Sequence, residues 1–477
     1  MNKKYFIYLI QQNKRIITLL FLLGFAIVPV ITAVNVGRFT DYHHYSYDGS
    51  TMTFIVYLII LIGLTYLVPL FNYRFIQYKR SCDTFLSLPI KRKELFNTVT
   101  LFSLVEMYVP YILNVILGSI VLIAKGYPFH IINFVSYLVI SLALVSVLYF
   151  ANTFIVLKCN NTIDSIICML GYSLLPVFIY FLRISFLDYY TFGLNDYYEF
   201  YWHQSIQSLI GHSCIFLMDS FSATSKEVFE FEWMAIYLFI GIALAAASSI
   251  SFVKRKAEDS EQLTNSRWMY RLLIPVYTII CIGFFTIEEG IGNYIIYMII
   301  IFIAYTIATF IANRQVKLSK LSIVLFITVM LITNVSGLVF EHTIAPKLSL
   351  AFPTNYDYME LNIYTSIGDY SLNSSYLEIN NDALVRQVQT LQHQLVEDHY
   401  NDIHYADYDT HLQVEYYDHN KHSIKSFYYP LSNAMAKQVY ALVLNNHQKV
   451  HCYDYSKPDS KEYELTLHQL NKIFAGE

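Results

Sequence analysis

Nine long apolar stretches dominate this sequence of 477 residues and restrict what it can fold into. A helix needs about 20 mainly apolar residues to cross a bilayer, because its backbone groups must be satisfied within the segment. Only 14% of the residues are charged, whereas soluble proteins contain about 25%. The sequence therefore predicts an all-α polytopic membrane protein with about nine transmembrane helices. The stretches cover residues 16–34, 51–71, 99–124, 134–157, 166–182, 234–253, 268–287, 294–312 and 321–340.

The basic residues are distributed unequally between the two ends of these stretches. Up to residue 340, the connections on the side of the N-terminus carry 19 Lys and Arg residues, and those on the other side carry four. Because cytoplasmic loops are enriched in Lys and Arg, this asymmetry predicts a multi-pass protein of the cell membrane with a cytoplasmic N-terminus. An odd number of spans then places everything after residue 340 outside the cytoplasm.

Residues 341–477 differ from the rest because they are polar and acidic, with 18 Asp and Glu against nine Lys and Arg. Helical spacing of apolar residues after Asn381 and Ser432 predicts two helices. The alternating residues 412–416 and the returning segment 424–429 predict a hairpin. We therefore expect a C-terminal α+β domain outside the membrane, with a further strand near residues 358–364.

The expected domain organisation has three parts. Residues 1–265 would form a core with six transmembrane helices, residues 266–340 three additional transmembrane helices, and residues 341–477 the extracytoplasmic domain. The other long outside segment covers residues 183–233. Its amphipathic run at residues 205–218 predicts short helices that lie on the outer membrane surface.

Composition and motifs speak against several function classes. The net charge of -4 provides no basic field for nucleic acid. No phosphate-binding loop, nucleophile elbow or zinc-binding helix motif occurs, so we expect no enzymatic activity and no cofactor bound by this chain. The six scattered cysteines indicate neither a zinc site nor a disulfide framework. The histidine pairs at positions 419 and 422 and at positions 447 and 451 are expected to be surface residues rather than metal ligands.

The most specific local patterns lie in the connections predicted to be cytoplasmic. Residues 1–15 have an apolar centre flanked by Lys and Arg, which predicts a helix in the inner interface before the chain turns into the first span. Between the second and third stretches, Asp83 is expected to cap a short helix that presents Phe85 and Leu86. Pro89 is expected to open the next helix, because proline fits a first helical turn. With the Lys-Arg-Lys-Glu cluster at residues 91–94, this elbow has the features of a docking surface.

The run Leu86-Ser-Leu-Pro-Ile-Lys-Arg-Lys-Glu-Leu95 resembles the coupling loop of permease subunits of type-2 ABC transporters. The similarity is to the Gram-positive branch associated with drug and antimicrobial-peptide export or resistance. The run Lys254-Arg-Lys-Ala-Glu-Asp-Ser-Glu261 is similar to the basic-then-acidic segment after the sixth span of such permeases. The resemblance covers about residues 1–265, and the three additional spans and the outside domain depart from the family pattern. The resemblance assigns an ATPase-coupling loop to Asp83, Phe85, Leu86, Leu88, Pro89, Arg92, Lys93 and Glu94, and a second cytoplasmic contact to Lys254, Arg255, Lys256 and Glu258.

This resemblance implies a half-transporter that pairs with a second permease copy or a paralogue in the lipid bilayer. ATP would be bound and hydrolysed by a separate cytoplasmic ABC ATPase subunit, and the coupling loop would relay its motion. A hydrophobic or peptide-like substrate would be exported or expelled.

Two polar residues inside the third stretch are candidates for a translocation path. Glu106 lies roughly 12 Å along the helix from the start of that stretch. An ionised side chain at mid-bilayer costs at least about 2.5 kcal/mol, so we expect Glu106 to face protein or a water-filled path. A structural role as a protonated or hydrogen-bonded side chain is the alternative. Asn114 is the weaker candidate, since such residues commonly tie helices together.

The sequence leaves two other functions possible. A membrane sensor or immunity protein would bind an antimicrobial peptide or an envelope lipid through residues 341–477 without transport. An integral-membrane transferase with a lipid-linked donor would need an acidic residue such as Asp41 or Asp48. No acidic pair or basic phosphate clamp in the sequence supports the transferase.

Overall fold

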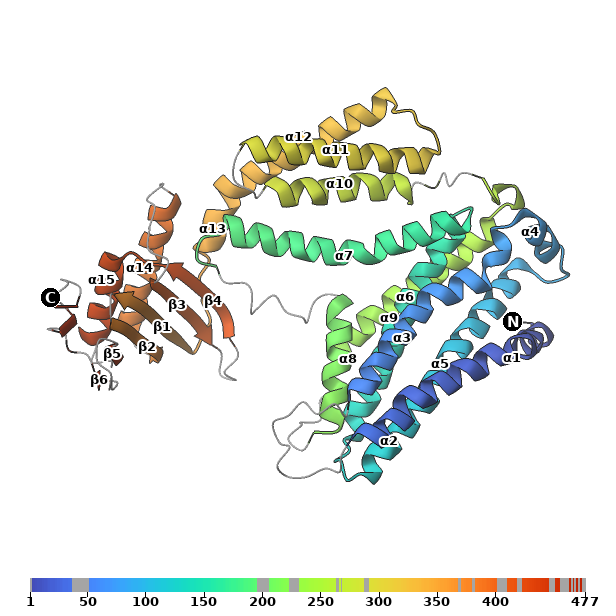
Figure 1. Ribbon diagram of the computed structural model, residues 1–477, viewed down its shortest axis with the longest axis horizontal. Helices are drawn as coiled ribbons and strands as arrows, with labels where there is room; N and C mark the ends of the chain where they lie inside the picture. Colours follow the sequence, from blue (N-terminus) through green and yellow to red (C-terminus); the bar gives the residue numbers. More distant parts are fainter. Residues whose placement is uncertain are drawn as a thin grey trace. The chain divides into compact units, whose positions relative to one another are not determined.

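Figure 1 shows the computed structural model of the chain, which is mainly helical and has one β-sheet near its C-terminus. The structure describes residues 2–36, 51–194, 206–222, 231–262, 266, 268–286, 291–367, 370–379, 382–400, 410–417, 423–445, 451–454, 463–464, 466, 469–470 and 472–473. The first of two compact units comprises Met1–Pro176, Trp202–Val276 and Ile307–Lys317, and the second Val177–Tyr201, Tyr277–Thr306 and Leu318–Glu477. The three-part domain division drawn from the sequence stays a prediction.

Eight helical segments in the described part of the chain are long and apolar enough to cross a membrane, so the chain has the helices of a multi-pass membrane protein. They comprise α1 (Lys3–Phe25) with α2 (Ile31–Asn35), α3 (Met52–Asn72), α5 (Arg92–Ala124), α6 (Ile131–Lys158), α7 (Thr162–Tyr190), α9 (Phe231–Lys254), α11 (Ile291–Asn313), and α12 (Lys320–Val339) with α13 (Ala345–Ser349). The seventh predicted span forms α10 (Tyr270–Thr286), which has 17 residues and contains Pro275. It is shorter than the other eight, and its crossing of the membrane stays a prediction. The remaining helices of this region are α4 (Lys79–Leu86) and α8 (Ile206–Ser220).

The N-terminal helix corrects one prediction. Asn2 caps α1, because its side chain accepts a hydrogen bond from the Tyr5 amide at 3.2 Å. The helix then passes Arg15 without interruption, since no glycine or proline precedes Gly24. A π-helical turn at Ala26–Val30 joins it to α2. The expected turn from an interfacial helix into the first span is therefore wrong, and a single helical segment runs from residue 3 to residue 35.

The amphipathic run at residues 205–218 is helical, as predicted. It forms α8, which packs along α6 (Figure 1). The His130 amide, just before α6, donates a hydrogen bond to the Ser220 carbonyl at 2.9 Å. Phe216 and Leu217 are buried in the same apolar core as Phe134 of α6. Phe216 and Leu217 of α8 are thus buried against a neighbouring helix of the first unit, and the position of α8 at the outer membrane surface stays a prediction.

Small residues allow α1 to approach α3 and α5 closely. Gly24 is buried beside Tyr57 of α3 and Asn114 of α5. Asn114 donates its amide N–H to the Phe21 carbonyl of α1 at 3.0 Å. One turn later, Val28 of the π-helical turn lies over Gly118 of α5. The contact between these helices therefore depends on backbone proximity, as is common for helix pairs in membranes.

Replacing Gly24 with Ala is expected to destabilise the first unit by about 1–3 kcal/mol. The added Cβ would lie 2.3 Å from the Tyr57 hydroxyl oxygen and 2.4 Å from the Asn114 side-chain nitrogen, which is too close for either atom. The measurement is reversible unfolding of the detergent-solubilised protein. Gly63→Ala is the matched control, because no atom lies within 4 Å of its added Cβ. Equal stability of the two variants would contradict this account of the packing.

The C-terminal region is built on a six-stranded antiparallel sheet with the strand order β4-β3-β1-β2-β5-β6. The strands are β1 (Tyr358–Ile367), β2 (Tyr370–Ile379), β3 (Thr410–Tyr417), β4 (Ser423–Pro430), β5 (His451–Asp454) and β6 (Tyr463–Glu464). Leu361, Val414 and Phe427 of the sheet share a core with Leu395 of α14 (Asp382–Tyr400) and Val439 of α15 (Asn433–Asn445). The predicted α+β pattern of this region is confirmed for both helices, the hairpin and the strand near residue 358.

A segment that follows α7 adds to the free edge of this sheet. The Tyr428 amide of β4 donates a hydrogen bond to the Gly193 carbonyl at 2.6 Å, and Leu194 forms an antiparallel bridge with Phe427. The ring of Phe192 stacks on the His399 ring of α14 at 3.9 Å. Residues 192–194, which we call the edge segment, thus join the end of α7 to the sheet within the second unit.

Candidate functional site

The predicted coupling loop forms a helical elbow whose helices begin at other residues than expected. A 3₁₀ turn at Arg74–Ile76 follows α3, and α4 begins at Lys79. Asp83 therefore lies inside α4 and does not cap it; the first amide of α4 is bound by the Glu261 carboxylate at 3.3 Å. Pro89 does not open α5, which begins at Arg92. It occupies a tight turn closed by the Ile90 amide and the Leu88 carbonyl at 2.7 Å.

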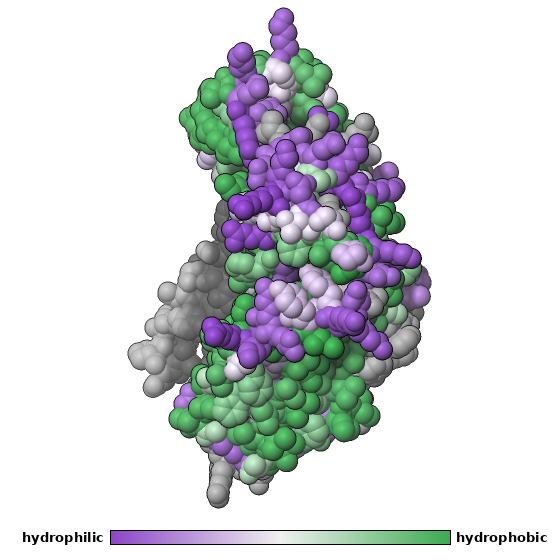
Figure 2. All heavy atoms as spheres, turned by 90° about the vertical axis from the view of Figure 1, so that its right-hand side faces the viewer, coloured by the Kyte–Doolittle hydropathy of each residue, from purple (hydrophilic) through white to green (hydrophobic). Residues whose placement is uncertain are grey.

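The elbow exposes polar and basic side chains around an anchored aromatic residue. Figure 2 shows hydrophilic side chains gathered on the face that carries the N-terminus and α4. Phe85 is half-buried and stacks on Phe75 with ring centroids 4.5 Å apart, so it holds α4 against the helical unit. Leu88 and Glu94 are partly buried, and the side chain of Leu86 lies outside the described set. The exposed residues of the elbow include Lys79, Arg80, Asp83, Pro89, Lys91, Arg92 and Lys93.

Arg92 joins the elbow to the second predicted contact segment. Its guanidinium donates hydrogen bonds to the Arg255 carbonyl at 2.8 Å and to the Val253 carbonyl at 3.3 Å. These carbonyls lie at the C-terminal end of α9, where a cation is stabilised by the helix dipole. The structure thus brings together two segments that are about 160 residues apart in the sequence.

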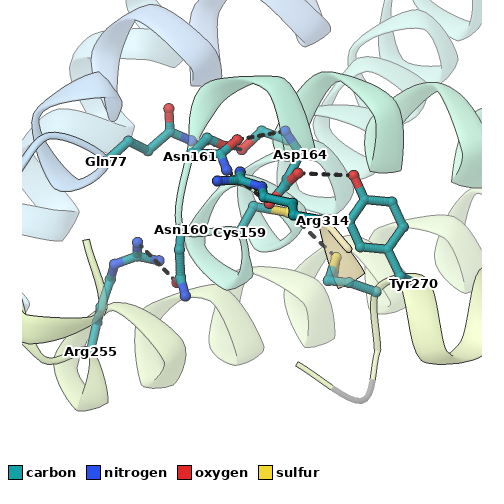
Figure 3. Close-up of polar contacts among 10 residues, drawn as sticks. Gln77, Cys159, Asn160, Asn161, Asp164, Arg255, Tyr270 and Arg314 are labelled. Atoms are coloured by element: carbon teal, nitrogen blue, oxygen red, sulfur yellow. Dashed lines mark hydrogen bonds and ion pairs between the residues drawn. The ribbon is translucent and has the colours of Figure 1, made fainter. Parts of the chain in front are cut away.

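Arg255 faces the interior, whereas its neighbours Lys254, Lys256 and Glu258 are exposed. Its side chain is only 9% exposed and donates to the Leu157 carbonyl at the end of α6. It also donates to the Ile76 carbonyl at 3.4 Å. A further hydrogen bond goes to the Asn160 side-chain oxygen at 3.5 Å (Figure 3). Burial lowers the pKa of Arg255, but an arginine still stays charged at neutral pH. Arg255 is therefore a buried connector of helix ends and is not available for docking.

A second buried charge lies at the start of α7. Asp164 is 6% exposed and accepts hydrogen bonds from Asn161 at 2.9 Å and from the Tyr270 hydroxyl at 3.0 Å. Arg314, at the end of α11, approaches the same carboxylate at 3.7 Å. Figure 3 shows these side chains and Arg255 together at the helix ends. We call the set the polar junction, which comprises Gln77, Asn160, Asn161, Asp164, Arg255, Tyr270 and Arg314.

The polar junction was not predicted, although one local signal existed. In the pattern Asn161-x-x-Asp164, the first side chain accepts a hydrogen bond from the Asp164 amide at 2.8 Å, which is typical of a helix N-terminus. Gln77 was not recognisable, because its bonds to Ser165 at 2.7 Å and Thr162 at 2.9 Å depend on the tertiary arrangement.

The two candidates for a translocation path are both buried in the first unit and lie two turns apart on α5. Asn114 donates to the Pro110 carbonyl at 2.9 Å, to the Phe21 carbonyl at 3.0 Å and to the Tyr57 hydroxyl at 3.3 Å. It therefore ties α1, α3 and α5 together. Glu106 is 5% exposed and accepts a hydrogen bond from Asn72 at 3.1 Å. A role of either residue in translocation stays a prediction.

Comparisons with protein-family models, curated proteins and solved structures give no match. The resemblance to type-2 ABC permeases therefore rests on sequence patterns within residues 1–265, chiefly those at residues 86–95 and 254–261.

Other candidate groups are only partly described. No group of three or more His, Cys, Asp or Glu side chains within the described ranges could hold a metal ion. His419, His422, His447, Asp41 and Asp48 lie outside the described residues.

The cysteines at the polar junction are buried free thiols. Cys159, which precedes α7, donates to the Met269 sulfur at 3.6 Å. A hydrogen bond with Cys168 and burial raise the pKa of the Cys159 thiol, so it is neutral and unreactive.

Proposed function

We propose that the chain is the membrane-spanning permease subunit of an ATP-driven ABC export or resistance system. A separate cytoplasmic ATPase subunit would bind and hydrolyse ATP, and the chain itself would catalyse no covalent step. The observation that carries the proposal is the link from the elbow to the ends of several spanning helices. Arg92 ties the elbow to α9, and Arg255 ties the end of α9 to the ends of α6 and of the turn after α3.

This link explains how a motor could act on the membrane helices. A force on α4 or on the start of α5 would reach α9 through Arg92, since its hydrogen bonds span the gap between the elements. Arg255 would pass the displacement to α6 through the Leu157 carbonyl. The proposal places this face and the N-terminus in the cytoplasm, in agreement with the excess of Lys and Arg there. The spanning helices would then alternate between inward-open and outward-open arrangements around a hydrophobic or peptide-like substrate.

The exposed charge of the elbow indicates the kind of surface that would bind it. Lys79 and Arg80 are exposed in the first turn of α4, and Lys91 and Lys93 are exposed at the start of α5. The complementary ATPase surface would therefore be acidic around an apolar centre. Arg92 is exposed, but its guanidinium already binds two carbonyl groups at the end of α9. It would therefore position the elbow rather than contact the ATPase subunit.

Reversing the charge of Lys91 and Lys93 together is expected to reduce co-purification of a nucleotide-binding ATPase subunit at least tenfold. The protein is extracted in mild detergent, and the retained ATPase is measured per mole of chain. Reversal of Lys3 and Lys4 is the control, because both are exposed on the same face but lie outside the elbow. Wild-type protein that retains no ATPase, or a Lys91/Lys93 variant that retains as much as wild type, would refute the coupling role.

A sensor or immunity protein is the second candidate, and the edge segment favours it. Residues 192–194 bind the end of α7 to the C-terminal sheet, so ligand binding on that domain could displace a spanning helix without transport. ATP-dependent movement of a substrate in vesicles that contain the chain and its ATPase would exclude this candidate.

A further inference from the structure

Glu106 is a buried carboxyl group within a membrane-spanning helix. It lies 14 residues after the start of α5, about 21 Å along a helix of 33 residues. The side chain is 5% exposed, and no Lys or Arg pairs with it among the described residues. An unpaired carboxylate at such a depth costs at least about 2.5 kcal/mol, so some group must neutralise or solvate it.

Asn72 links this carboxyl group to a cluster of polar side chains. From the end of α3, Asn72 donates to the Glu106 carboxylate at 3.1 Å and to the Ser103 hydroxyl at 2.8 Å. The next residue, Tyr73, shares a hydrogen bond of 2.7 Å with Thr100 of α5.

Two buried hydroxyl groups of α6 complete the cluster without satisfied hydrogen bonds. Tyr149 and Thr153 are fully buried, and neither hydroxyl oxygen has a partner of normal geometry. The Tyr149 hydroxyl faces Ser103, Thr153 and Tyr73. Because buried hydroxyls are normally hydrogen-bonded, their open valences indicate a site that can take up a further donor or acceptor.

Among the described residues, no charged side chain contacts Glu106. Its polar contact is Asn72, which also binds Ser103, and the Tyr149 hydroxyl of α6 lies next to Ser103. The smallest ligand that neutralises a carboxylate is a proton, and a protonated carboxyl gains an O–H that can donate to an acceptor with an open valence. Linked through Asn72 to this polar cluster, the Glu106 carboxyl can both hold and release a proton.

We infer that Glu106 is a membrane-embedded proton-binding site of this protein, held by Asn72 and the hydroxyl cluster of α5 and α6. The proton binds at a carboxylate oxygen of Glu106 and leaves to water, so no other group is oxidised or reduced. This inference does not depend on the ATPase coupling proposed above, because protonation can be measured without a partner.

The test is labelling of the detergent-solubilised full chain with dicyclohexylcarbodiimide, which reacts with protonated carboxyl groups in apolar surroundings. Mass spectrometry is expected to locate the adduct on Glu106, with at least tenfold more labelling at pH 6 than at pH 9. Glu106→Gln should remove the adduct. Asp219→Asn should not, because Asp219 lies on α8, away from the cluster.

Three results would overturn the inference. Equal labelling at pH 6 and pH 9 would mean a permanently protonated structural residue. Protection by NaCl, but not by choline chloride, at constant pH would assign the site to Na⁺ instead of a proton. Absence of an adduct, together with infrared spectra that show no pH-dependent carboxyl band lost in Glu106→Gln, would mean that Glu106 does not titrate.

Discussion

Replacing Arg255 with Met is expected to lower the free energy of unfolding by about 1–3 kcal/mol, because the buried Leu157 carbonyl loses its guanidinium donor and the link between the helix ends is broken. The carbonyls of Leu157 and Ile76 and the side chain of Asn160 all accept from this guanidinium. The Ile76 carbonyl keeps the Ser260 hydroxyl as a donor at 2.8 Å, so the main cost falls on the Leu157 carbonyl. An unsatisfied buried acceptor costs about 1–3 kcal/mol. The measurement is unfolding of the detergent-solubilised protein by heat or denaturant, with the yield of folded protein as a second readout.

The adjacent residue provides the control for this prediction. Lys254 is exposed, so Lys254→Met should change the unfolding free energy by less than about 0.5 kcal/mol. Arg255→Lys should fall between the two, since an ammonium group keeps the charge but cannot reproduce the planar fork. A stable Arg255→Met protein would show that the polar junction does not hold the helix ends together.

Replacing Gly193 with Ala is expected to release the edge segment from the sheet. Gly193 has φ +78°, a left-handed conformation that costs other residues roughly 1–2 kcal/mol. The added Cβ would lie 2.0 Å from the Tyr429 ring, which is fully buried and cannot move aside. The Tyr428 amide, which donates to the Gly193 carbonyl, should then exchange with deuterium at least tenfold faster.

Gly241→Ala is the matched control for this exchange measurement. Its added Cβ would lie 3.5 Å from Val147, an ordinary contact, and at a backbone conformation open to all residues. Unchanged protection of the Tyr428 amide in Gly193→Ala would mean that the edge segment contributes nothing to the sheet.

The sequence predicts the spanning helices and the C-terminal elements well, since each depends on a local periodicity of apolar residues. It predicts poorly where helices begin. Residues 1–15 are amphipathic, which suits an interfacial helix and also the end of a longer spanning one. The helix starts in the elbow are also poorly predicted. Asp83 and Pro89 are residue types that favour a helix start, but the extended residues that precede α4 and α5 are Tyr78 and Lys91.

The sequence does not predict the roles of the residues in the candidate site. The basic clusters at residues 91–93 and 254–256 lie in segments that Arg92 joins, yet composition does not reveal which arginine turns inward. Arg255 can be buried because its guanidinium donates hydrogen bonds to the carbonyl groups of Leu157 and Ile76, which are remote in the sequence. The contact between Gly193 and Tyr429 is hidden for the same reason, since only the folded chain brings positions 236 residues apart together.

The edge segment has a consequence for the solubility of the C-terminal domain. An outermost strand presents a row of unpaired amide and carbonyl groups on which a strand of another molecule can assemble. At β4 the chain supplies its own partner, because Leu194 and Gly193 pair with Phe427 and Tyr428. Shortened proteins that begin after residue 194 would leave this side of the sheet open, and they should self-associate through β4 more readily than the full chain.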